Sequence, residues 1–143
     1  MVVTDRTEET GEAVTSALEI MIVDDEPTVG RRLAPVLAKL GCEVETFVNP
    51  REAMRRLDEK TFDVVITDVV MKEATGVQVL EHVMRKTDHT KVIIITGFAM
   101  MSLAREAMDK GAFDFLAKPF HLDDLRGVVA KAAEALGAPL EIV

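Results

Sequence analysis

Four short apolar stretches of this sequence each lead into polar residues that could do chemistry together. Asp24 and Asp25 follow the run IMIV, Asp68 follows VVIT, and Thr96 and Lys118 follow two later runs. Three carboxylates held close together repel one another and raise each other's pKa values unless a cation compensates. Oxygen donors without His or Cys suit a hard cation, and Mg2+ is the obvious one. These residue types therefore predict a magnesium site.

Phosphoryl chemistry follows from such a site, because Mg2+ keeps several waters and commonly bridges to phosphate. Asp68 can act as a nucleophile and form an aspartyl phosphate. Lys118 would offset charge on the phosphoryl oxygens, and the Thr96 hydroxyl could hydrogen-bond one of them. Taken singly, each residue has a plainer explanation: a helix start, a turn residue or a solvated surface charge. Their common position after successive strands favours the phosphoryl site.

The segments that must position these residues alternate between strand patterns and helical apolar spacing. Strands are expected over 18–23, 42–47, around 64–66, 92–95 and 112–116, and a helix is expected after each of them. Five strands alternating with five helices predict an α/β protein: a single three-layer domain with a parallel sheet between two layers of helices.

The strand compositions also predict the order of the sheet. The first, third and fourth strands are continuously apolar, as interior strands are, whereas the second and fifth carry Glu43, Glu45 and Asp114. This pattern matches the flavodoxin-like order 2-1-3-4-5, in which the ligand site lies at the switch between strands one and three. The acids after those two strands, Asp25 and Asp68 among them, are therefore expected to be neighbours.

The first helix, expected between Pro27 and Gly41, contains two residues that oppose helix formation. Gly30 weakens a helix, and Pro35 removes one backbone hydrogen bond and should bend it. We still expect a helix there, because the apolar spacing continues past Pro35 to Leu37.

Length and composition bound the remaining possibilities. The 143 residues suffice for about one domain, expected over 18–137, with a disordered N-terminal tail over 1–17 and a C-terminal tail over 138–143. A net charge of −8 argues against nucleic acid as a partner. The single cysteine, Cys42, excludes an internal disulfide and fits a reducing compartment. No membrane span or signal peptide is recognisable, so we expect a cytoplasmic protein.

Four motifs carry a family resemblance: IMIVDDEP, VVITDVVM with Gly76 downstream, VIIITG, and GAFDFLAKPF. In this order they resemble the receiver domain of bacterial two-component response regulators, and the similarity covers Leu18 to Leu136. The stretch ITGFAMMSLAREAMDKGAFDFLAKPF is especially similar to receivers of the nitrogen-regulation type. The resemblance implies a phosphorylation-dependent signalling switch rather than a turnover enzyme.

The resemblance also implies roles for individual residues. Asp68 would be the phosphoacceptor. Asp25, Asp68 and the backbone carbonyl of Val70 would bind Mg2+ directly, and Asp24 would act through water. Lys118 would contact the phosphoryl group.

Three further residues receive roles from the same resemblance. Thr96 would be the switch hydroxyl, and Phe115 would be the aromatic side chain that turns inward when Thr96 moves. The peptide bond between Lys118 and Pro119 is cis in the family, which marks a specific loop geometry.

The sequence departs from the family in two places. Lys72 stands where Pro is usual, which predicts a more mobile loop and an additional cation near the site, and Pro35 is unusual in the first helix. Separately, Val70 and Phe98 are apolar at positions that line the mouth of a receiver's phosphoryl site, so they cannot orient an attacking water. We therefore expect an aspartyl phosphate that lasts for hours rather than seconds, unless both residues serve only in packing.

The partner implied for phosphate transfer is a sensor histidine kinase or a histidine phosphotransfer protein. The downstream partner is not written in the sequence. The face formed by the helix at 101–110, the strand at 112–116 and the last helix is a candidate homodimer surface. The sequence ends soon after that helix, which suggests a single-domain regulator, although a receiver cut from a longer protein would look identical.

Two alternatives belong to other functional classes. A haloacid-dehalogenase-like phosphatase also uses Asp, Mg2+, Thr and Lys. Such an enzyme requires a second acid two residues after the nucleophile, where this chain has Val70. A phosphate-independent interaction module would normally have lost Asp25, Asp68 or Lys118, and all three are present.

Overall fold

The computed structural model of this protein describes residues 17–140. The N-terminal tail expected over 1–17 lies outside the described residues except for its last position, and so do the last three residues of the expected C-terminal tail. Within the described part, no helix has the length and apolar character needed to cross a membrane.

Strands and helices alternate through the described residues as the sequence pattern predicts. In chain order the elements are β1 (Glu19–Val23), α1 (Pro27–Lys39), β2 (Glu43–Phe47), α2 (Pro50–Glu59), β3 (Val64–Asp68), α3 (Gly76–Lys86), β4 (Lys91–Thr96), the short 3-10 helix η1 (Phe98–Met100), α4 (Met101–Asp109), β5 (Asp114–Ala117) and α5 (Leu122–Ala135).

The five strands form one parallel sheet in the order β2-β1-β3-β4-β5, which confirms the predicted order. The register of β1 against β3 pairs Val23 with Thr67. Asp24 is the first residue after β1 and Asp68 is the last residue of β3, so the two acids lie side by side at the carboxyl edge of the sheet. The sheet therefore brings together two acids that are far apart in the sequence.

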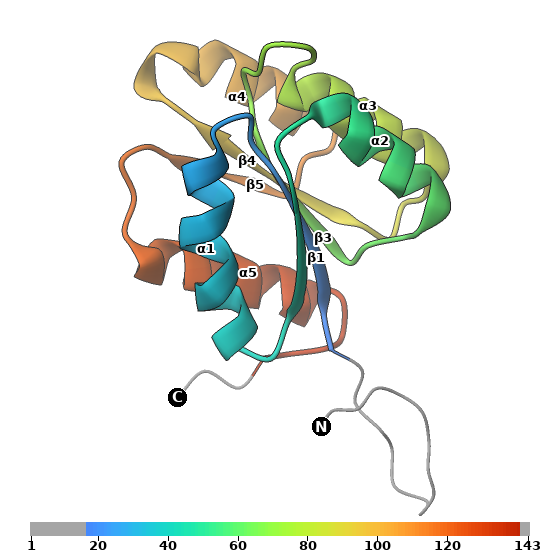
Figure 1. The fold of residues 1–143 in the computed structure, drawn as a ribbon, viewed down its shortest axis with the longest axis vertical. Helices are drawn as coiled ribbons and strands as arrows, with labels where there is room; N and C mark the ends of the chain where they lie inside the picture. The colour runs from blue at the N-terminus through green and yellow to red at the C-terminus, as the bar shows by residue number, and fades with distance from the viewer. Residues whose placement is uncertain (1–16, 141–143) are drawn as a thin grey trace, which may run out of the picture.

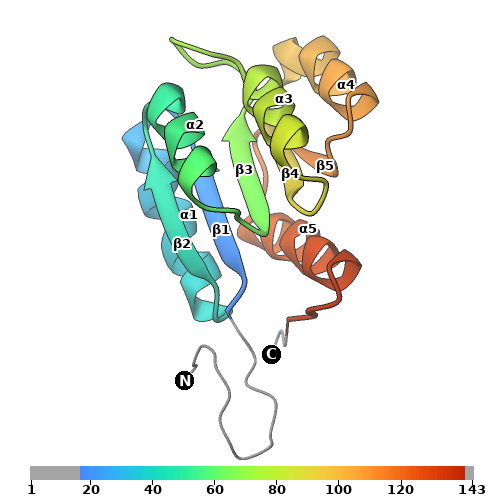
Figure 2. The same cartoon turned by 90° about the vertical axis from the view of Figure 1, so that its right-hand side faces the viewer.

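Two helical layers cover the sheet. Helices α1 and α5 lie on one face, and α2, α3 and α4 lie on the other (Figures 1 and 2). Alternate side chains of β1 belong to two separate hydrophobic cores. Ile20 and Ile22 pack beneath α1 and α5, and Met21 and Val23 pack beneath α2 and α3. The continuous apolar run of a central strand is thus used on both faces, as expected for an interior parallel strand.

Helix α1 tolerates both residues that oppose helix formation. It runs to Lys39 with Pro35 inside it, and Gly41 follows with a φ of +90°. A Cβ added to Gly30 would lie 3.1 Å from the Thr46 side chain on β2. Gly30 therefore allows α1 to approach the edge strand closely, which offsets the lower helix propensity of glycine.

One predicted strand boundary differs from the structure, and a side-chain cap sets the start of α3. Strand β5 begins at Asp114 rather than Ala112, because the Ala112 amide donates to the Ala107 carbonyl at 3.0 Å and completes the end of α4. Gly76 is the first residue of α3, and Thr75 caps this helix in a reciprocal pair of hydrogen bonds with Gln78.

Candidate functional site

The three predicted metal-ligating acids meet at the carboxyl edge of the sheet. Asp24, Asp25 and Asp68 each offer a carboxylate oxygen, and these oxygens lie within 4.8 Å of one another. Two acids come from the end of β1 and one from the end of β3, whose adjacency places them together. No His or Cys joins this cluster among the residues that the structure describes, so its donor set is oxygen only. Such a set suits a hard divalent cation.

Asp24 supplies the observation that best fits a cation. It is 2% exposed, and its Oδ1 accepts the Glu26 amide at 2.9 Å. Its Oδ2 is also buried and accepts no hydrogen bond from any described residue. Burial raises the pKa of Asp24 to about 6, and the charges of Asp68 and Asp25 add to that rise. A buried carboxylate oxygen without a partner is costly, and a metal ion or its water removes that cost.

Asp68 is the last residue of β3, and part of its side chain reaches solvent. Its Oδ1 accepts the Val69 amide at 2.8 Å, and the Lys118 ammonium lies 3.7 Å from its Oδ2. Burial raises the pKa of Asp68, while Lys118 and the backbone amides of Val69 and Val70 oppose that rise. The carboxylate is 14% exposed, so part of it is accessible from solvent.

The loop between β3 and α3 folds back over the cluster. Val70 and Thr75 form an antiparallel bridge, and the Gly76 amide donates to the Val69 carbonyl at 2.8 Å. A Cβ at Gly76 would lie 2.5 Å from the Asp68 carbonyl oxygen, so only glycine fits there. The Gly76 of the sequence motif therefore permits the tight turn that returns the chain to the site.

Lys72 contacts the site through its backbone. Its amide donates to Asp25 Oδ2 at 3.0 Å, while its side chain is exposed. The family resemblance predicts a more mobile loop at Lys72 and does not predict this hydrogen bond. The sequence did contain one indication of this bond: Lys, unlike the Pro that is usual here, has a backbone N–H that can donate.

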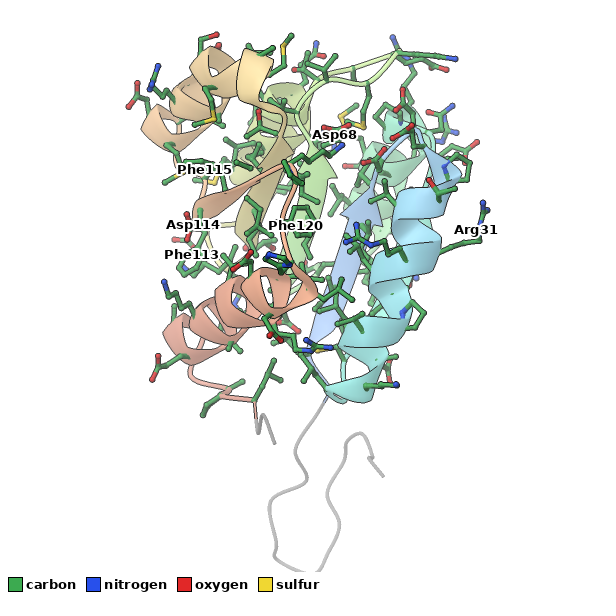
Figure 3. All side chains as sticks on the ribbon, turned by 90° about the vertical axis from the view of Figure 1, so that its left-hand side faces the viewer. Arg31, Asp68, Phe113, Asp114, Phe115 and Phe120 are labelled. Atoms are coloured by element: carbon green, nitrogen blue, oxygen red, sulfur yellow. The ribbon has the colours of Figure 1, made fainter. Side chains whose placement is uncertain are left out.

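The two predicted switch residues lie on neighbouring strands. Thr96 ends β4, is fully buried, and donates its hydroxyl hydrogen to the Gly97 carbonyl at 3.0 Å. Phe115 lies on the edge strand β5, is partly buried, and packs against the core beneath α3 and α4 (Figure 3). The Lys118 amide donates to the Thr96 carbonyl at 2.7 Å, which ties the end of β5 to β4. The peptide bond from Lys118 to Pro119 is cis, as expected.

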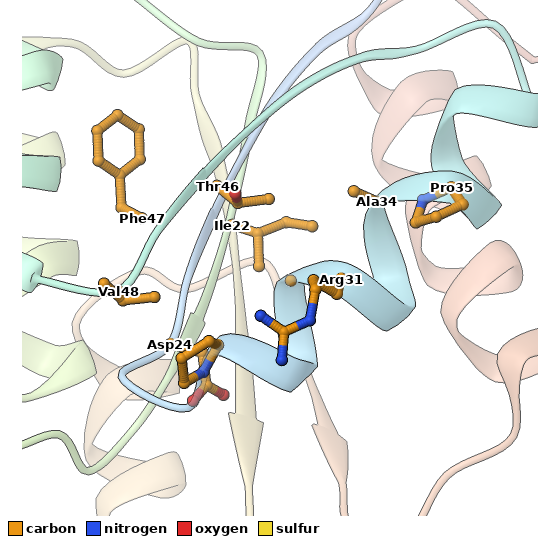
Figure 4. Close-up of a pocket in the computed structure, with 10 residues that line it drawn as sticks. Ile22, Asp24, Arg31, Ala34, Pro35, Thr46, Phe47 and Val48 are labelled. Atoms are coloured by element: carbon orange, nitrogen blue, oxygen red, sulfur yellow. The ribbon is translucent and has the colours of Figure 1, made fainter.

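Two hollows lie near the site, one beside Asp24 and the other beside Lys118. One, of about 520 Å³, borders Asp24 on the side of α1 and β2 and is lined by Arg31, Thr46 and Val48 among others (Figure 4). The other, of about 490 Å³, includes Lys118 and lies beside Phe120, whose ring centroid is 5.7 Å from the Arg32 guanidinium carbon.

Comparison with known proteins agrees with this geometry. The family model described as the response regulator receiver domain matches residues 20–130. The regulatory protein AtoC of Escherichia coli (strain K12) is 36% identical over 129 residues, which are 90% of this chain and 28% of that protein. The DNA-binding transcriptional regulator NtrC of the same organism is 33% identical over 79% of this chain and 24% of its own length. This chain thus spans about a quarter of either relative.

Solved structures give the same result. A response regulator receiver domain protein from Clostridium thermocellum has a TM-score of 0.78 and 34% identity, covering 82% of this chain and 94% of that one. The beryllofluoride-activated NtrC4 receiver domain dimer has a TM-score of 0.77 and 30% identity, covering 82% and 98%. With the matched family model and the strand order, these similarities show that the chain belongs to the receiver domain family of two-component response regulators and is of the nitrogen-regulation-like type.

Proposed function

We propose that this protein is a phosphorylation-dependent switch whose phosphoacceptor is Asp68. The donor is a phosphohistidine on a sensor histidine kinase or on a histidine phosphotransfer protein. The observation that carries this proposal is the meeting of Asp24, Asp25 and Asp68, with Lys118 beside Asp68 and one buried Asp24 oxygen that has no partner among the described residues.

The acids fit Mg2+ by donor type and by the unpartnered oxygen of Asp24. Asp25, Asp68 and the Val70 carbonyl would hold the ion directly, and Asp24 would hold one of its waters. When bound, Mg2+ neutralises charge on the phosphoryl oxygens and lets acids of like charge remain ionised together.

In the transfer, a carboxylate oxygen of Asp68 forms a bond to phosphorus while the bond from phosphorus to the donor's histidine nitrogen breaks, leaving a neutral imidazole after protonation. Lys118 would pair with a phosphoryl oxygen, and its ammonium, 3.7 Å from Asp68 Oδ2, supports that role. The roles of the protein here are positioning and electrostatic stabilisation, which dominate phosphoryl transfer in general.

The response to phosphate would run through Thr96 and Phe115. The Thr96 hydroxyl now bonds the Gly97 carbonyl, so turning toward a phosphoryl group exchanges one hydrogen bond for another. Phe115 would then move inward and change the α4–β5 face, where a protein partner or a second copy of the chain would bind. Phosphate thus biases a two-state equilibrium.

Acetyl phosphate with Mg2+, followed by intact mass measurement, tests the proposal. Wild type should gain the mass of one phosphoryl group, and Asp68→Asn should gain none. Asp58→Asn, which removes an exposed acid on α2 that pairs with His82, is the matched control and should label like wild type. Equal labelling of Asp68→Asn would overturn the assignment, and labelling in EDTA would overturn the role of the metal.

A further inference from the structure

We propose that the β3–α3 loop of this chain is clasped to α2 by Glu73, and that the clasp orients Asp25 for Mg2+ through the Lys72 amide. The loop clasp consists of the Glu73 carboxylate, the Arg51 guanidinium and the Asn49 amide group. The inference rests on the proposed function, since it concerns how the same acids receive the ion.

The contact between Lys72 and Asp25 is the functional end of the clasp. The Lys72 amide donates to Asp25 Oδ2 at 3.0 Å, so among the described residues the other carboxylate oxygen of Asp25 stays available to a cation. The Lys72 side chain is exposed, and the contact with Asp25 is made by the backbone amide. Hydrogen bonds from outside a metal site commonly orient the ligands and raise metal affinity. Lys72 is therefore a positioning residue.

Glu73, the next residue in the chain, forms the other end. Its Oε1 lies 3.2 Å from Arg51 Nε, and its Oε2 accepts a hydrogen bond from Asn49 Nδ2 at 3.4 Å. Where Glu73 is held, the Lys72 amide one residue earlier is held as well. The clasp thus connects the start of α2 to a ligand at the end of β1.

The base of the clasp is itself fixed. Asn49 is the N-cap of α2, and its Oδ1 accepts the Arg51 amide at 2.8 Å and the Glu52 amide at 3.3 Å, so its Nδ2 is free to face Glu73. Helix α2 is anchored in the core by Ala53 and Leu57, which are almost fully buried. The loop is therefore attached to a rigid element rather than to another loop.

If Glu73 and Arg51 acted only through their charges, the two substitutions would change Mg2+ affinity in opposite directions. Glu73 and Arg51 are both exposed, at 49% and 65% of the side chain. If they acted only through their charges, removing Glu73 would weaken Mg2+ binding and removing Arg51 would strengthen it. If they act as a clasp, removing either one weakens binding, because either loss frees the Lys72 amide.

The experiment measures Mg2+ affinity by calorimetry for wild type, Glu73→Gln and Arg51→Gln, with amide hydrogen exchange at Lys72 followed by NMR in the metal-free protein. We expect the dissociation constant to rise about two- to fivefold in both variants, as for the loss of an exposed ion pair. Lys72 exchange should accelerate in both. Glu59→Gln breaks the exposed ion pair with Arg56 at the other end of α2 and should change neither quantity.

Each outcome decides between explanations. Tighter or unchanged Mg2+ binding in Arg51→Gln overturns the clasp and leaves the proposed function standing. Unchanged Lys72 exchange in both variants overturns it as well, whatever the affinities. If wild type binds no Mg2+, the proposed function fails, and the clasp loses its role with it.

Discussion

The two ends of the sheet use aspartate in opposite ways. At the amino edge, Asp63 is fully partnered: its Oδ2 accepts the Glu19 amide at 2.8 Å, its Oδ1 lies 2.8 Å from His89 Nε2, and its carbonyl accepts the Lys91 amide at 3.0 Å. At the carboxyl edge, Asp24 keeps one buried oxygen with no partner among the described residues. A satisfied acid joins strands, whereas an unsatisfied acid is available to a ligand.

The largest expected effect is at the amino edge. Asp63→Ala should lower the free energy of unfolding by about 2 kcal/mol, because it leaves the partly buried Glu19 amide without its acceptor, whereas the half-exposed His89 can bond water instead. Phosphorylation of the folded variant should be unchanged. Urea unfolding with acetyl phosphate labelling measures both. Asp88→Ala, an exposed acid one residue before His89, is the control and should leave stability unaltered. Loss of phosphoryl labelling in folded Asp63→Ala would contradict the assignment of a purely structural role to the aspartate at the amino edge.

Asp24→Asn should act in the opposite direction. It removes a buried charge that faces Asp25 and Asp68, so the metal-free protein should gain about 1 kcal/mol of stability at pH 7. The same change should weaken Mg2+ binding about tenfold or more, as the loss of an outer-shell partner does. Urea unfolding of the metal-free protein measures the change in stability, and calorimetry with Mg2+ measures the change in affinity. A variant that is less stable than wild type without Mg2+ would show that Asp24 is structural.

The stability gain of Asp24→Asn should also depend on pH. Because the pKa of Asp24 is raised to about 6 in the folded protein, the folded state binds more protons than the unfolded state between about pH 4 and pH 6. The contribution of Asp24 to the free energy of unfolding of wild type therefore falls by about 1–2 kcal/mol as pH rises through that window. The gain of the variant over wild type should shrink on going from pH 7 to pH 5. A gain that grows on acidification would contradict the raised pKa.

The smallest expected effect concerns the lifetime of the phosphorylated form. Val70 is 45% exposed beside the cluster and offers an attacking water no hydrogen bond. Wild type should keep its phosphoryl group for a time on the order of hours, and Val70→Asn should shorten that time several-fold. Mass spectrometry after removal of acetyl phosphate follows the decay. Equal decay in the two proteins would mean that Val70 is only a packing residue.

Much of the fold and most of the site could be predicted from the sequence. Apolar runs such as Ile20–Val23 are long enough to identify interior strands, and acidic strands such as β2 identify an edge. The boundary of β5 was wrong because Ala112 and Phe113 look like strand residues, yet the Ala112 amide closes the end of α4. Strand ends are decided by such competing hydrogen bonds, which composition does not reveal.

The sequence by itself determined that Asp24, Asp25 and Asp68 would gather, because parallel strands place their carboxyl ends on one edge and the apolar pattern orders the strands. Only the tertiary structure decided which oxygens are satisfied. The bond from Lys72 to Asp25 joins residues 47 positions apart, and the clasp of Glu73 joins a loop to another helix. Contacts of this kind depend on the path of a loop through space, which local residue preferences do not specify.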